Sequence, residues 1–432
     1  MRVAIHTLGT RGDVQPYLAL ALGLKQAGHE VLIAAPSQFE SFVVSRGIAF
    51  AHLPSEYLAL LETPEAKAAM AGGAGFMAGF RMLKQFRPIG RQQLSAEWQA
   101  ARRFRPELII YHPKAIAAAH IAEKLSCPAV LASPLPGFTP TAAFASPLVP
   151  FRSLGPLNRL THSAMAHSAY ALFRGMIGEW RATELHLANT PEKKLRPRAT
   201  LYAYSPHVVP VPPDWPNTVA VTGYWFLGGD DVWQPDPQLQ RFVEGDERPV
   251  YVGFGSMPGV DPTSLTKLVL EALAKAGKRG VLAVGGGALR GDLGASHVHF
   301  IQGAPHAQLF PLMSACVHHG GAGTTGAALR AGKPNIICPF FGDQPFWGRR
   351  IDDLGVGPRS RGVRNLSADW LAAAIAEATG NPLIQQRANR LGEAIRVEDG
   401  VASAIGFLRS QHLLNQARNC TGRFKRLELQ CR

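Results

Sequence analysis

Short apolar runs alternate with amphipathic stretches and glycine-rich breaks along the first part of the chain. An apolar run at residues 3–6 precedes a Gly/Thr/Arg loop, and a stretch of helical periodicity follows at residues 14–27 before a second apolar run at residues 31–35. This order predicts a β-α-β unit, and its continuation predicts a parallel sheet covered by helices. The continuation consists of strands at residues 108–111 and 129–132 and a helix at residues 115–125.

The same alternation restarts in the second half of the chain. A proline-dense stretch, SPHVVPVPPDWP, and a strand at residues 218–226 separate the halves. Five strands are predicted after them, at residues 249–254, 280–284, 297–301, 315–318 and 336–340, with helices at residues 265–276 and 325–331.

Two repeats of this kind predict an α/β protein with two doubly wound, Rossmann-like domains that face a central cleft. Ligands of such folds bind outside the carboxyl ends of the strands, so the glycine loops of both halves should line that cleft. The expected parts are a first domain at residues 1–226, a linker at 227–248, a second domain at 249–395, a C-terminal helix at 396–410 that packs back on the first domain, and a basic tail at 411–432.

Composition narrows the class of protein. With 432 residues, 46% of them hydrophobic and 18% charged, the chain has the make-up of an ordinary globular protein. Its apolar stretches are far shorter than the roughly 20 residues of a membrane-spanning helix, and its start lacks the apolar core of a signal peptide, which predicts a cytoplasmic protein. Five scattered cysteines without CxxC spacing favour neither a disulfide framework nor a zinc site.

The formal charge of +14 is compatible with nucleic acid, an anionic lipid surface or an acidic ligand. No zinc finger, RRM or basic-zipper pattern accompanies the basic residues, so nucleic acid is not expected as a partner. A basic and aromatic segment at residues 72–94 suits either a membrane interface or an ordinary surface helix.

The strongest chemical signal is the stretch VHHGGAGTTGAALRAG in the second half. Small residues there allow a ligand close to the backbone, and the following helix presents unpaired N–H groups and a partial positive charge at its start. A phosphate or diphosphate is the expected ligand. His318 and His319 are adjacent on a strand and point to opposite faces, so they cannot share a metal; we expect His319 to face the ligand.

The same letters also satisfy the dinucleotide fingerprint G-x-G-x-x-G at Gly321, Gly323 and Gly326, with Asp343 after the next strand. That fingerprint normally lies in the first β-α-β unit of a domain, whereas here the loop follows the fourth predicted strand of the second half. A protein that binds NAD or is not catalytic therefore remains an alternative.

Several segments of the chain resemble those of a known enzyme family. HHGGAGTT, LRAGKP and PFFGDQPFWG resemble the nucleotide-sugar signature of inverting glycosyltransferases with the GT-B architecture, and more narrowly of sterol glucosyltransferases from bacteria, fungi and plants. GTRGDVQPYLALALGLKQAGHEV, IIYHPKAIAAAHIAEKL, VTGYWFL and PVYVGFGSMPG are similar to the same family. The likeness covers most of residues 1–407.

The resemblance implies positions for the site residues. Asp13 falls where the inverting enzymes have their general base, and Thr10, Arg11 and Gly12 of the same loop are expected either to face the donor or only to shape the loop. It implies further that Asp343 and Gln344 bind hydroxyls of the transferred hexose. The donor diphosphate would contact Ser256, His319, Gly321, Gly323 and Thr324.

Each position also has a simpler interpretation. Asp is a favoured N-cap, so Asp13 could cap a helix that starts at Val14, and Asp343-Gln344 before Pro345 could be ordinary turn residues. The sequence holds no DxD triplet, and helix N–H groups with His319 can neutralise a leaving diphosphate, so neither a metal nor another cofactor is expected.

The chain departs from the family pattern where the nucleobase is bound. Gly303 stands where many related enzymes have a tryptophan that stacks on uracil, and PHAQLFP, with Ala307 and Gln308, replaces the usual PHDWLFP. Ala327 stands at the position of the ribose-binding glutamate of many plant enzymes, as in the sterol-type branch.

The function expected from the resemblance is transfer of glucose from UDP-glucose to the hydroxyl of a sterol or sterol-like lipid. The alternatives are another hydrophobic alcohol, such as a hopanoid, a carotenoid, a macrolide or a hydroxy-acyl lipid, and a nucleotide-sugar 2-epimerase, which needs no acceptor. Peripheral contact with an anionic membrane is a further expectation.

Overall fold

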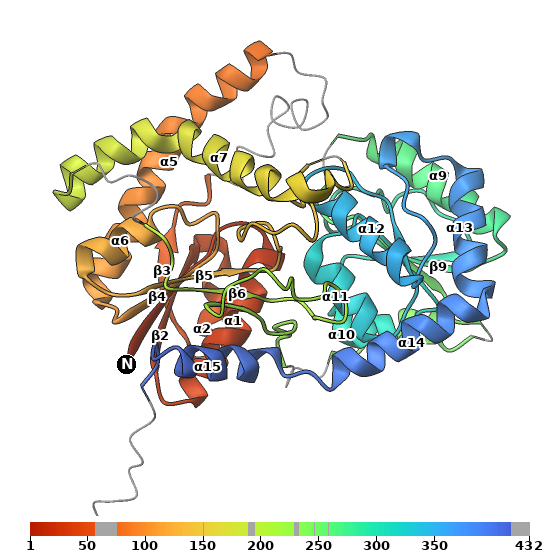
Figure 1. The fold of residues 1–432 in the computed structure, drawn as a ribbon. Coiled ribbons are helices and arrows are strands. Elements are labelled where there is room, and N and C mark those ends of the chain that lie inside the picture. Colours follow the sequence, from red (N-terminus) through yellow and green to blue (C-terminus); the bar gives the residue numbers. More distant parts are fainter. Residues whose placement is uncertain are drawn as a thin grey trace, which may run out of the picture.

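In the computed structural model the described residues form two sheets, one of seven and one of five strands, and all strand pairings among them are parallel (Figure 1). We call the seven-stranded sheet with its helices the first domain and the five-stranded sheet with its helices the second domain. The predicted α/β class with two doubly wound halves is confirmed. The structure describes residues 1–56, 76–149, 151–188, 195–228, 233–245, 247–257 and 259–415, and only the backbone of residues 76–87, 169 and 172.

The first sheet has the strand order β3-β2-β1-β4-β5-β6-β7. Its strands are β1 (Arg2–His6), β2 (Glu30–Pro36), β3 (Ala49–Leu53), β4 (Leu108–Tyr111), β5 (Ala129–Ser133), β6 (Ala199–Tyr202) and β7 (Val219–Val221). The central neighbours β1 and β4 end together, because His6 pairs with Tyr111. β7 is shorter than the predicted strand at residues 218–226, since the chain turns at Gly223, whose φ is +90°.

The second sheet has the order β10-β9-β8-β11-β12. Its strands are β8 (Val250–Gly253), β9 (Gly280–Ala283), β10 (Val298–Ile301), β11 (Cys316–His318) and β12 (Asn335–Ile337). β11 is the fourth strand along this half, and the glycine loop follows it as predicted. In the sheet β11 lies between β8 and β12.

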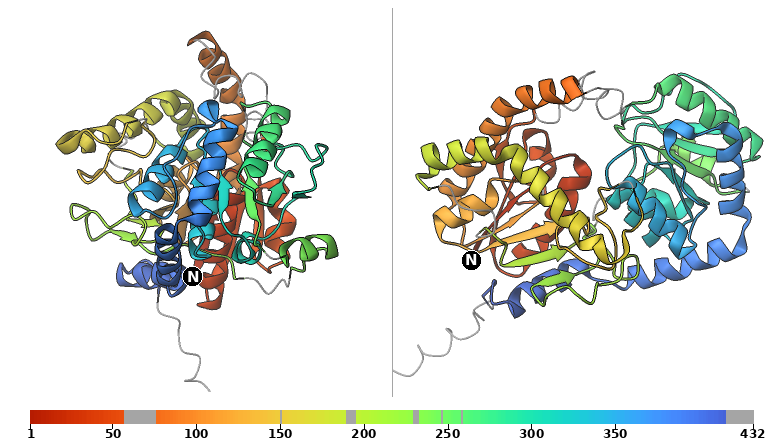
Figure 2. Two further views of the ribbon diagram at one scale, coloured as in Figure 1. Left: turned by 90° about the vertical axis from the view of Figure 1, so that its right-hand side faces the viewer. Right: turned by 45° about the horizontal axis from the view of Figure 1, so that its top comes forward.

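Helices cover both sheets, as the two further views in Figure 2 show. Those of the first half are α1 (Arg11–Gln26), α2 (Glu40–Val44), α5 (Phe76–Phe104), α6 (Ala118–Leu125) and α7 (Asn158–Trp180), with the short turns η1 (Ser37–Phe39), η2 (Gly155–Leu157) and η3 (Arg181–Leu185). Those of the second half are α8 (Pro237–Val243), α9 (Pro262–Lys275), α10 (His306–Leu309), α11 (Ala322–Arg330), α12 (Gln344–Leu354), α13 (Ala368–Gly380), α14 (Pro382–Arg396) and α15 (Gly400–Ser410), with η5 (Phe310–Leu312) and η6 (Val363–Asn365).

Some boundaries differ from the predicted ones for local reasons. α1 begins at Arg11 rather than at residue 14, because Thr10 acts as its N-cap. The predicted linker contains the helix α8, which tolerates Pro237 because proline fits the first helical position after the N-cap Asp236. Asp230 and Asp231 of that linker lie outside the described residues, as do residues 416–432 of the predicted tail.

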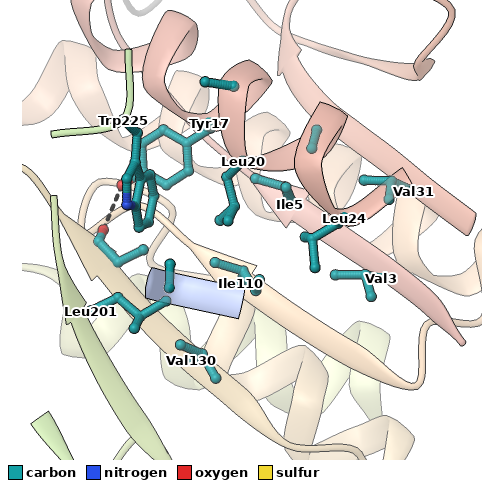
Figure 3. Close-up of a cluster of buried hydrophobic side chains, with 14 of the residues drawn as sticks. Val3, Ile5, Tyr17, Leu20, Leu24, Val31, Ile110, Val130, Leu201 and Trp225 are labelled. Atoms are coloured by element: carbon teal, nitrogen blue, oxygen red, sulfur yellow. Dashed lines mark hydrogen bonds between the residues drawn. The ribbon is translucent and has the colours of Figure 1, made fainter. Parts of the chain in front are cut away.

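One core of the first domain lies between its sheet and α1 (Figure 3). Ile5, Leu20, Leu24 and Val130 are fully buried in it, and burying such a side chain is worth about 1.5 to 3 kcal/mol relative to leaving it exposed. The C-terminal helix α15 belongs to the same core through residues such as Leu408. α5, α6 and the end of α7 cover the opposite face.

A shared apolar cluster joins the two domains. Tyr204 and Tyr224, from the loops after β6 and β7, pack with Trp347 of α12, and the ring centroids of Tyr204 and Trp347 are 6.2 Å apart. A Cβ on Gly326 of α11 would lie 2.5 Å from the Tyr224 ring, so this close approach requires glycine. The two carboxyl-end loop sets are therefore held against each other by packing.

Candidate functional site

The loop after β1 is organised by a capping box at the start of α1. Thr10 is the N-cap, and its backbone N–H donates to Asp13 Oδ2 at 2.8 Å. Asp13 is the third residue of the helix, so the interpretation of Asp13 as the N-cap itself is wrong, although its carboxylate does take part in the cap. This arrangement fixes one carboxylate oxygen and leaves the other free for different partners.

The second oxygen of Asp13 meets two residues that follow β4. Lys114 Nζ lies 3.0 Å and His112 Nε2 3.3 Å from Asp13 Oδ1. His112 Nδ1 accepts a hydrogen bond from the backbone N–H of Lys114 at 3.1 Å, so the ring proton is on Nε2 and points at the carboxylate. The sequence analysis did not single out either residue. The sequence feature that could have revealed them is their position directly after β4, the strand that pairs with β1.

These neighbours set the charge of the group. Burial alone would raise the pKa of Asp13, but Lys114 and His112 together hold that pKa well below its ordinary value. Burial lowers the pKa of His112, so its ring is neutral near neutral pH. Asp13 is therefore a carboxylate, 18% exposed, over the whole ordinary pH range.

The glycine loop after β11 is shaped by His318. Its Nε2 lies 2.8 Å from Asn335 Oδ1, and its Nδ1 accepts from the backbone N–H of Gly320 at 3.1 Å. Gly320 has a φ of +89°, which a residue with a side chain rarely adopts. His318 is fully buried, as expected for the histidine that faces the core, and it orients the turn into α11.

His319 lies at the start of this turn with an unused nitrogen. The side chain is half-buried, and its Nδ1 has no hydrogen-bond partner among the described residues. A Cβ on Gly321 would lie 2.5 Å from His319 Nε2, so glycine at the N-cap of α11 makes room for the ring. Burial, with a smaller contribution from His306, lowers the pKa of His319 to about 4.

His306, at the start of α10, adds a further basic group that the sequence analysis missed. Its ring stacks on Phe310 with the centroids 4.3 Å apart. Burial and the charge of Arg11 lower the pKa of His306 to about 4. Arg11 belongs to the first domain, so basic groups of both domains converge near the start of α11. The sequence feature that could have revealed His306 is its position in PHAQLFP, directly before an apolar turn.

Asp343 lies on the second domain opposite the Asp13 loop. Its Oδ2 accepts from Trp347 Nε1 at 2.8 Å, and burial raises its pKa. The charge of Lys114 lowers that pKa and the charge of Asp13 raises it, so both charges lie within electrostatic range of Asp343. The two carboxylates, one from each domain, are therefore close enough to interact electrostatically.

Gln344 is bound to its own loop. Its Oε1 accepts from the backbone N–H groups of Phe340 and Phe341, at 2.7 and 3.2 Å, and its Nε2 contacts Met257 Sδ at 3.2 Å. With only 5% of its surface exposed, Gln344 holds the loop before α12 in shape. Since sulfur is a weak acceptor, the amide N–H groups are the part left for a ligand.

The remaining expected residues surround the same loops. Ser256 is exposed after β8, Gly323 is exposed in the first turn of α11, and Thr324 beside it is half-buried. Arg11 and Gly12 are exposed at the start of α1, where Arg11 Nε donates to Gln15 Oε1 at 3.1 Å. In the PHAQLFP segment Gln308 Oε1 accepts from the backbone N–H of Trp233 at 3.1 Å.

Known proteins match both halves of the chain. Residues 3–144 match the family described as the glycosyltransferase family 28 N-terminal domain, and residues 289–399 match the erythromycin biosynthesis protein CIII-like C-terminal domain. Sterol 3-beta-glucosyltransferase of Aspergillus fumigatus is 39% identical over 426 residues, and that of Yarrowia lipolytica 37% over 423, each across 94% of this chain. The chain belongs to the GT-B glycosyltransferases. The predicted family is thereby confirmed.

The alignment covers only part of those relatives. This glycosyltransferase spans 29% of the length of the Aspergillus fumigatus enzyme and 28% of the Yarrowia lipolytica enzyme.

Solved structures share the fold. The glycotransferase of kitacinnamycin superposes with a TM-score of 0.70 at 19% identity, over 95% of this chain and 98% of the other. The glycosyltransferase VinC in complex with DTDP superposes with a TM-score of 0.64 at 21% identity, over 95% and 100%. The GT-B architecture expected from the sequence is confirmed.

Proposed function

We propose that this glycosyltransferase transfers glucose from UDP-glucose to the hydroxyl of a sterol or sterol-like lipid, with inversion at the anomeric carbon. The observation that carries the proposal is the electrostatic interaction of Asp13, from the first domain, with Asp343, from the second, next to the turn at Gly320 that follows His319. The sterol acceptor is supported by the identity to sterol 3-beta-glucosyltransferases across 94% of this chain.

The donor diphosphate would be bound at the start of α11. The backbone N–H groups near Gly321, Gly323 and Thr324 are available there, because the first turn of a helix leaves its N–H groups unpaired. His319 offers a ring nitrogen without a partner among the described residues. A dianionic ligand would favour protonation of His319, and the cation then neutralises the charge that develops on the leaving diphosphate.

The hexose would lie between that diphosphate and the first domain. Asp343 presents a carboxylate for hydroxyls of the sugar, and Gln344 presents the N–H groups of an amide that its loop already orients. Ser256, on the neighbouring loop after β8, is exposed toward solvent and open to a ligand. This extends the expected roles: Gln344 both shapes the site and contacts the sugar.

Asp13 would be the general base. The acceptor oxygen attacks the anomeric carbon from the face opposite the diphosphate, the bond from that carbon to the diphosphate oxygen breaks, and the acceptor proton passes to a carboxylate oxygen of Asp13. His112 and Lys114 orient this oxygen. General-base catalysis of this kind contributes about 10² to 10⁴ in rate.

A direct test is transfer by the purified full chain, followed by mass spectrometry, with UDP-glucose and a panel of sterols, hopanoids and other lipid alcohols. We expect a β-glucoside of a sterol. Parallel reactions with dTDP-glucose test the donor base, because Gly303 and Gln308 depart from the usual pattern and the VinC structure holds DTDP.

Different outcomes would contradict different parts of the proposal. Glucoside formation only on a non-sterol alcohol would overturn the acceptor, and exclusive use of dTDP-glucose would overturn the donor. Consumption of UDP-glucose without any acceptor would favour an epimerase or hydrolase and overturn the transfer reaction itself.

Lys114→Met should move the acid limb of the pH–activity profile to higher pH. Lys114 is the strongest of the groups that hold the pKa of Asp13 below its ordinary value, and Asp13 acts as the carboxylate. Removing the ammonium raises that pKa, so activity is lost on acidification at a pH about 1 to 3 units higher than in the wild type. The measurement is kcat/KM for the acceptor from about pH 3 to pH 8; the wild-type rate should stay level on the acid side of this range, whereas that of Lys114→Met should fall there.

Lys278→Met is the matched control, because Lys278 pairs with Glu247 in the second domain and its loss should leave the profile unchanged. Coincident acid limbs for Lys114→Met and wild type would argue against Asp13 as the titrating base.

A further inference from the structure

The start of α7 carries its polar residues inward and its apolar residues outward. Asn158 and Thr161 are 1% and 6% exposed, whereas Leu157 and Leu160 are 56% and 61% exposed. Helices at a protein surface normally show the opposite pattern. These leucines are therefore exposed because the polar side chains of this turn occupy its buried face, and not because the end of the helix frays.

Hydrogen bonds of the buried side chains Asn158 and Thr161 hold this inverted turn in place. Asn158 Oδ1 accepts from the backbone N–H of Leu154 at 2.7 Å, and its Nδ2 donates to the carbonyl of Ala142 at 2.9 Å. Thr161 Oγ1 accepts from the backbone N–H of Ser146 at 2.8 Å. The leucines are thus presented on a rigid base.

Further apolar side chains extend the exposed area. The loop after β5 and η2 contribute several, each about two fifths exposed or more. We define the apolar surface as Phe138, Leu148, Phe151, Leu154, Leu157 and Leu160. Hydrogen bonds of Thr161 with Ser146 and of Asn158 with Ala142 hold the loop after β5 against the start of α7. Exposed apolar side chains that gather in this way mark sites of protein or membrane interaction.

The electrostatic surroundings favour an anionic partner. The sequence has no aspartate or glutamate between Lys124 and Glu179, a stretch that includes the whole apolar surface. Arg152 and Arg159 lie within it, and they pair with Asp353 and Asp214 from outside it. On the neighbouring α12, burial and the positive charge of Arg152 lower the pKa values of Arg349 and Arg350, so these three arginines lie close to one another.

Position in the fold connects this surface to the acceptor. The loop that carries Phe138 and Leu148 starts at the carboxyl end of β5, the edge of the first sheet at which the Asp13 loop also lies. The beginning of α7 lies beside α12 of the second domain (Figure 1), where Arg152 contacts Asp353. The apolar surface therefore flanks the junction of the two domains.

We propose that the apolar surface is the face with which the enzyme docks on an anionic lipid bilayer. The proposal rests on the proposed function in so far as the acceptor is a membrane lipid, which would then be taken up at the edge of the sheet that carries Asp13. Leucine and phenylalanine side chains would enter the headgroup region, and the arginines would attract anionic lipid. Within the described residues no helix is long and apolar enough to cross a membrane.

The test is co-sedimentation of the full chain with vesicles of phosphatidylcholine alone or of phosphatidylcholine and phosphatidylserine in equal parts. We expect binding to the mixed vesicles and a loss of about tenfold or more in partitioning for the double variant Leu157→Glu/Leu160→Glu. Leu157→Ser/Leu160→Ser removes the apolar contact without added charge and should also lose binding. The control Leu383→Glu/Val397→Glu alters side chains that are 59% and 86% exposed elsewhere and should bind like wild type.

Each outcome decides the proposal separately from the reaction. Binding lost in both leucine variants, with transfer to detergent-dispersed sterol unchanged, supports it. No binding of the wild type to mixed vesicles overturns it whether or not the enzyme transfers glucose. Equal binding of leucine variants and wild type overturns the assigned surface, and a wild-type dimer that the variants dissociate would identify the partner as a second copy of the chain.

Discussion

Asp13→Asn is expected to reduce kcat by about 10² to 10⁴ while leaving the affinity for the nucleotide sugar nearly unchanged. Asparagine retains an oxygen that can accept from the Thr10 N–H, so the capping box and the start of α1 should persist. It cannot take up the acceptor proton. The measurements are initial rates of glucoside formation under saturating UDP-glucose and calorimetric titration with UDP.

Asp236→Asn is the matched control for this variant. Asp236 is also a helix-capping carboxylate, which accepts from Gln238 and Leu239 at the start of α8, away from the site. Its replacement should leave kcat unaltered. If Asp13→Asn kept more than about a tenth of the wild-type rate, the assignment of the base would be wrong, and His112 would be the next residue to test.

His319→Ala is expected to reduce kcat/KM by about 10² to 10³, the effect of removing one group that stabilises developing negative charge. The side chain is half-buried beside the start of α11, and its Nδ1 has no partner among the described residues, so its loss breaks no hydrogen bond that holds the fold there. The denaturation midpoint should therefore stay close to that of the wild type. A large fall in that midpoint would indicate a structural role instead.

A second readout uses the pKa of His319, which is about 4 in the unliganded protein. Binding of a diphosphate raises this pKa, so UDP should bind more tightly as the pH falls toward it, and binding near pH 6 should take up protons. Calorimetry in buffers of different ionisation enthalpy measures that uptake. It should shrink in His319→Ala and persist in the control His297→Ala, whose histidine lies before β10 and contacts Leu270 O. Equal proton uptake in wild type and His319→Ala would contradict this assignment.

The alternation of apolar and amphipathic stretches was enough to predict the central strands and α1. The central strands are buried on both faces, as at Ile5 of β1, and α1 carries one clear apolar stripe, which includes Leu24. α7 could not be predicted in the same way. Its first turn buries Asn158 and exposes Leu160, so periodicity gives the wrong face there.

The part of the candidate site that is formed by backbone N–H groups could be predicted from the sequence. The glycine loop and the helix start at Gly321 follow from small residues and a strand-to-helix transition. His112 and Lys114 could not be found from spacing, because they follow a strand about a hundred residues after Asp13 and meet it only through the pairing of β1 with β4. The pairing of Gln344 with Phe340 likewise depends on loop geometry. In the basic and aromatic segment at residues 72–94, residues 72–75 lie outside the described residues and residues 76–87 of α5 are described by their backbone alone. Its membrane contact therefore stays a prediction.

The return of α15 to the first sheet has a consequence for the modularity of the chain. Ala404, Ile405 and Leu408 complete the core around α1, and a Cβ on Gly23 of α1 would lie 2.3 Å from Val401 Cγ1, so the two helices fit each other closely. The first folding unit is thus discontinuous in sequence. Recombining such enzymes with a single junction would separate α1 from its matching partner, and a viable chimera requires two junctions, one on each side of the second sheet.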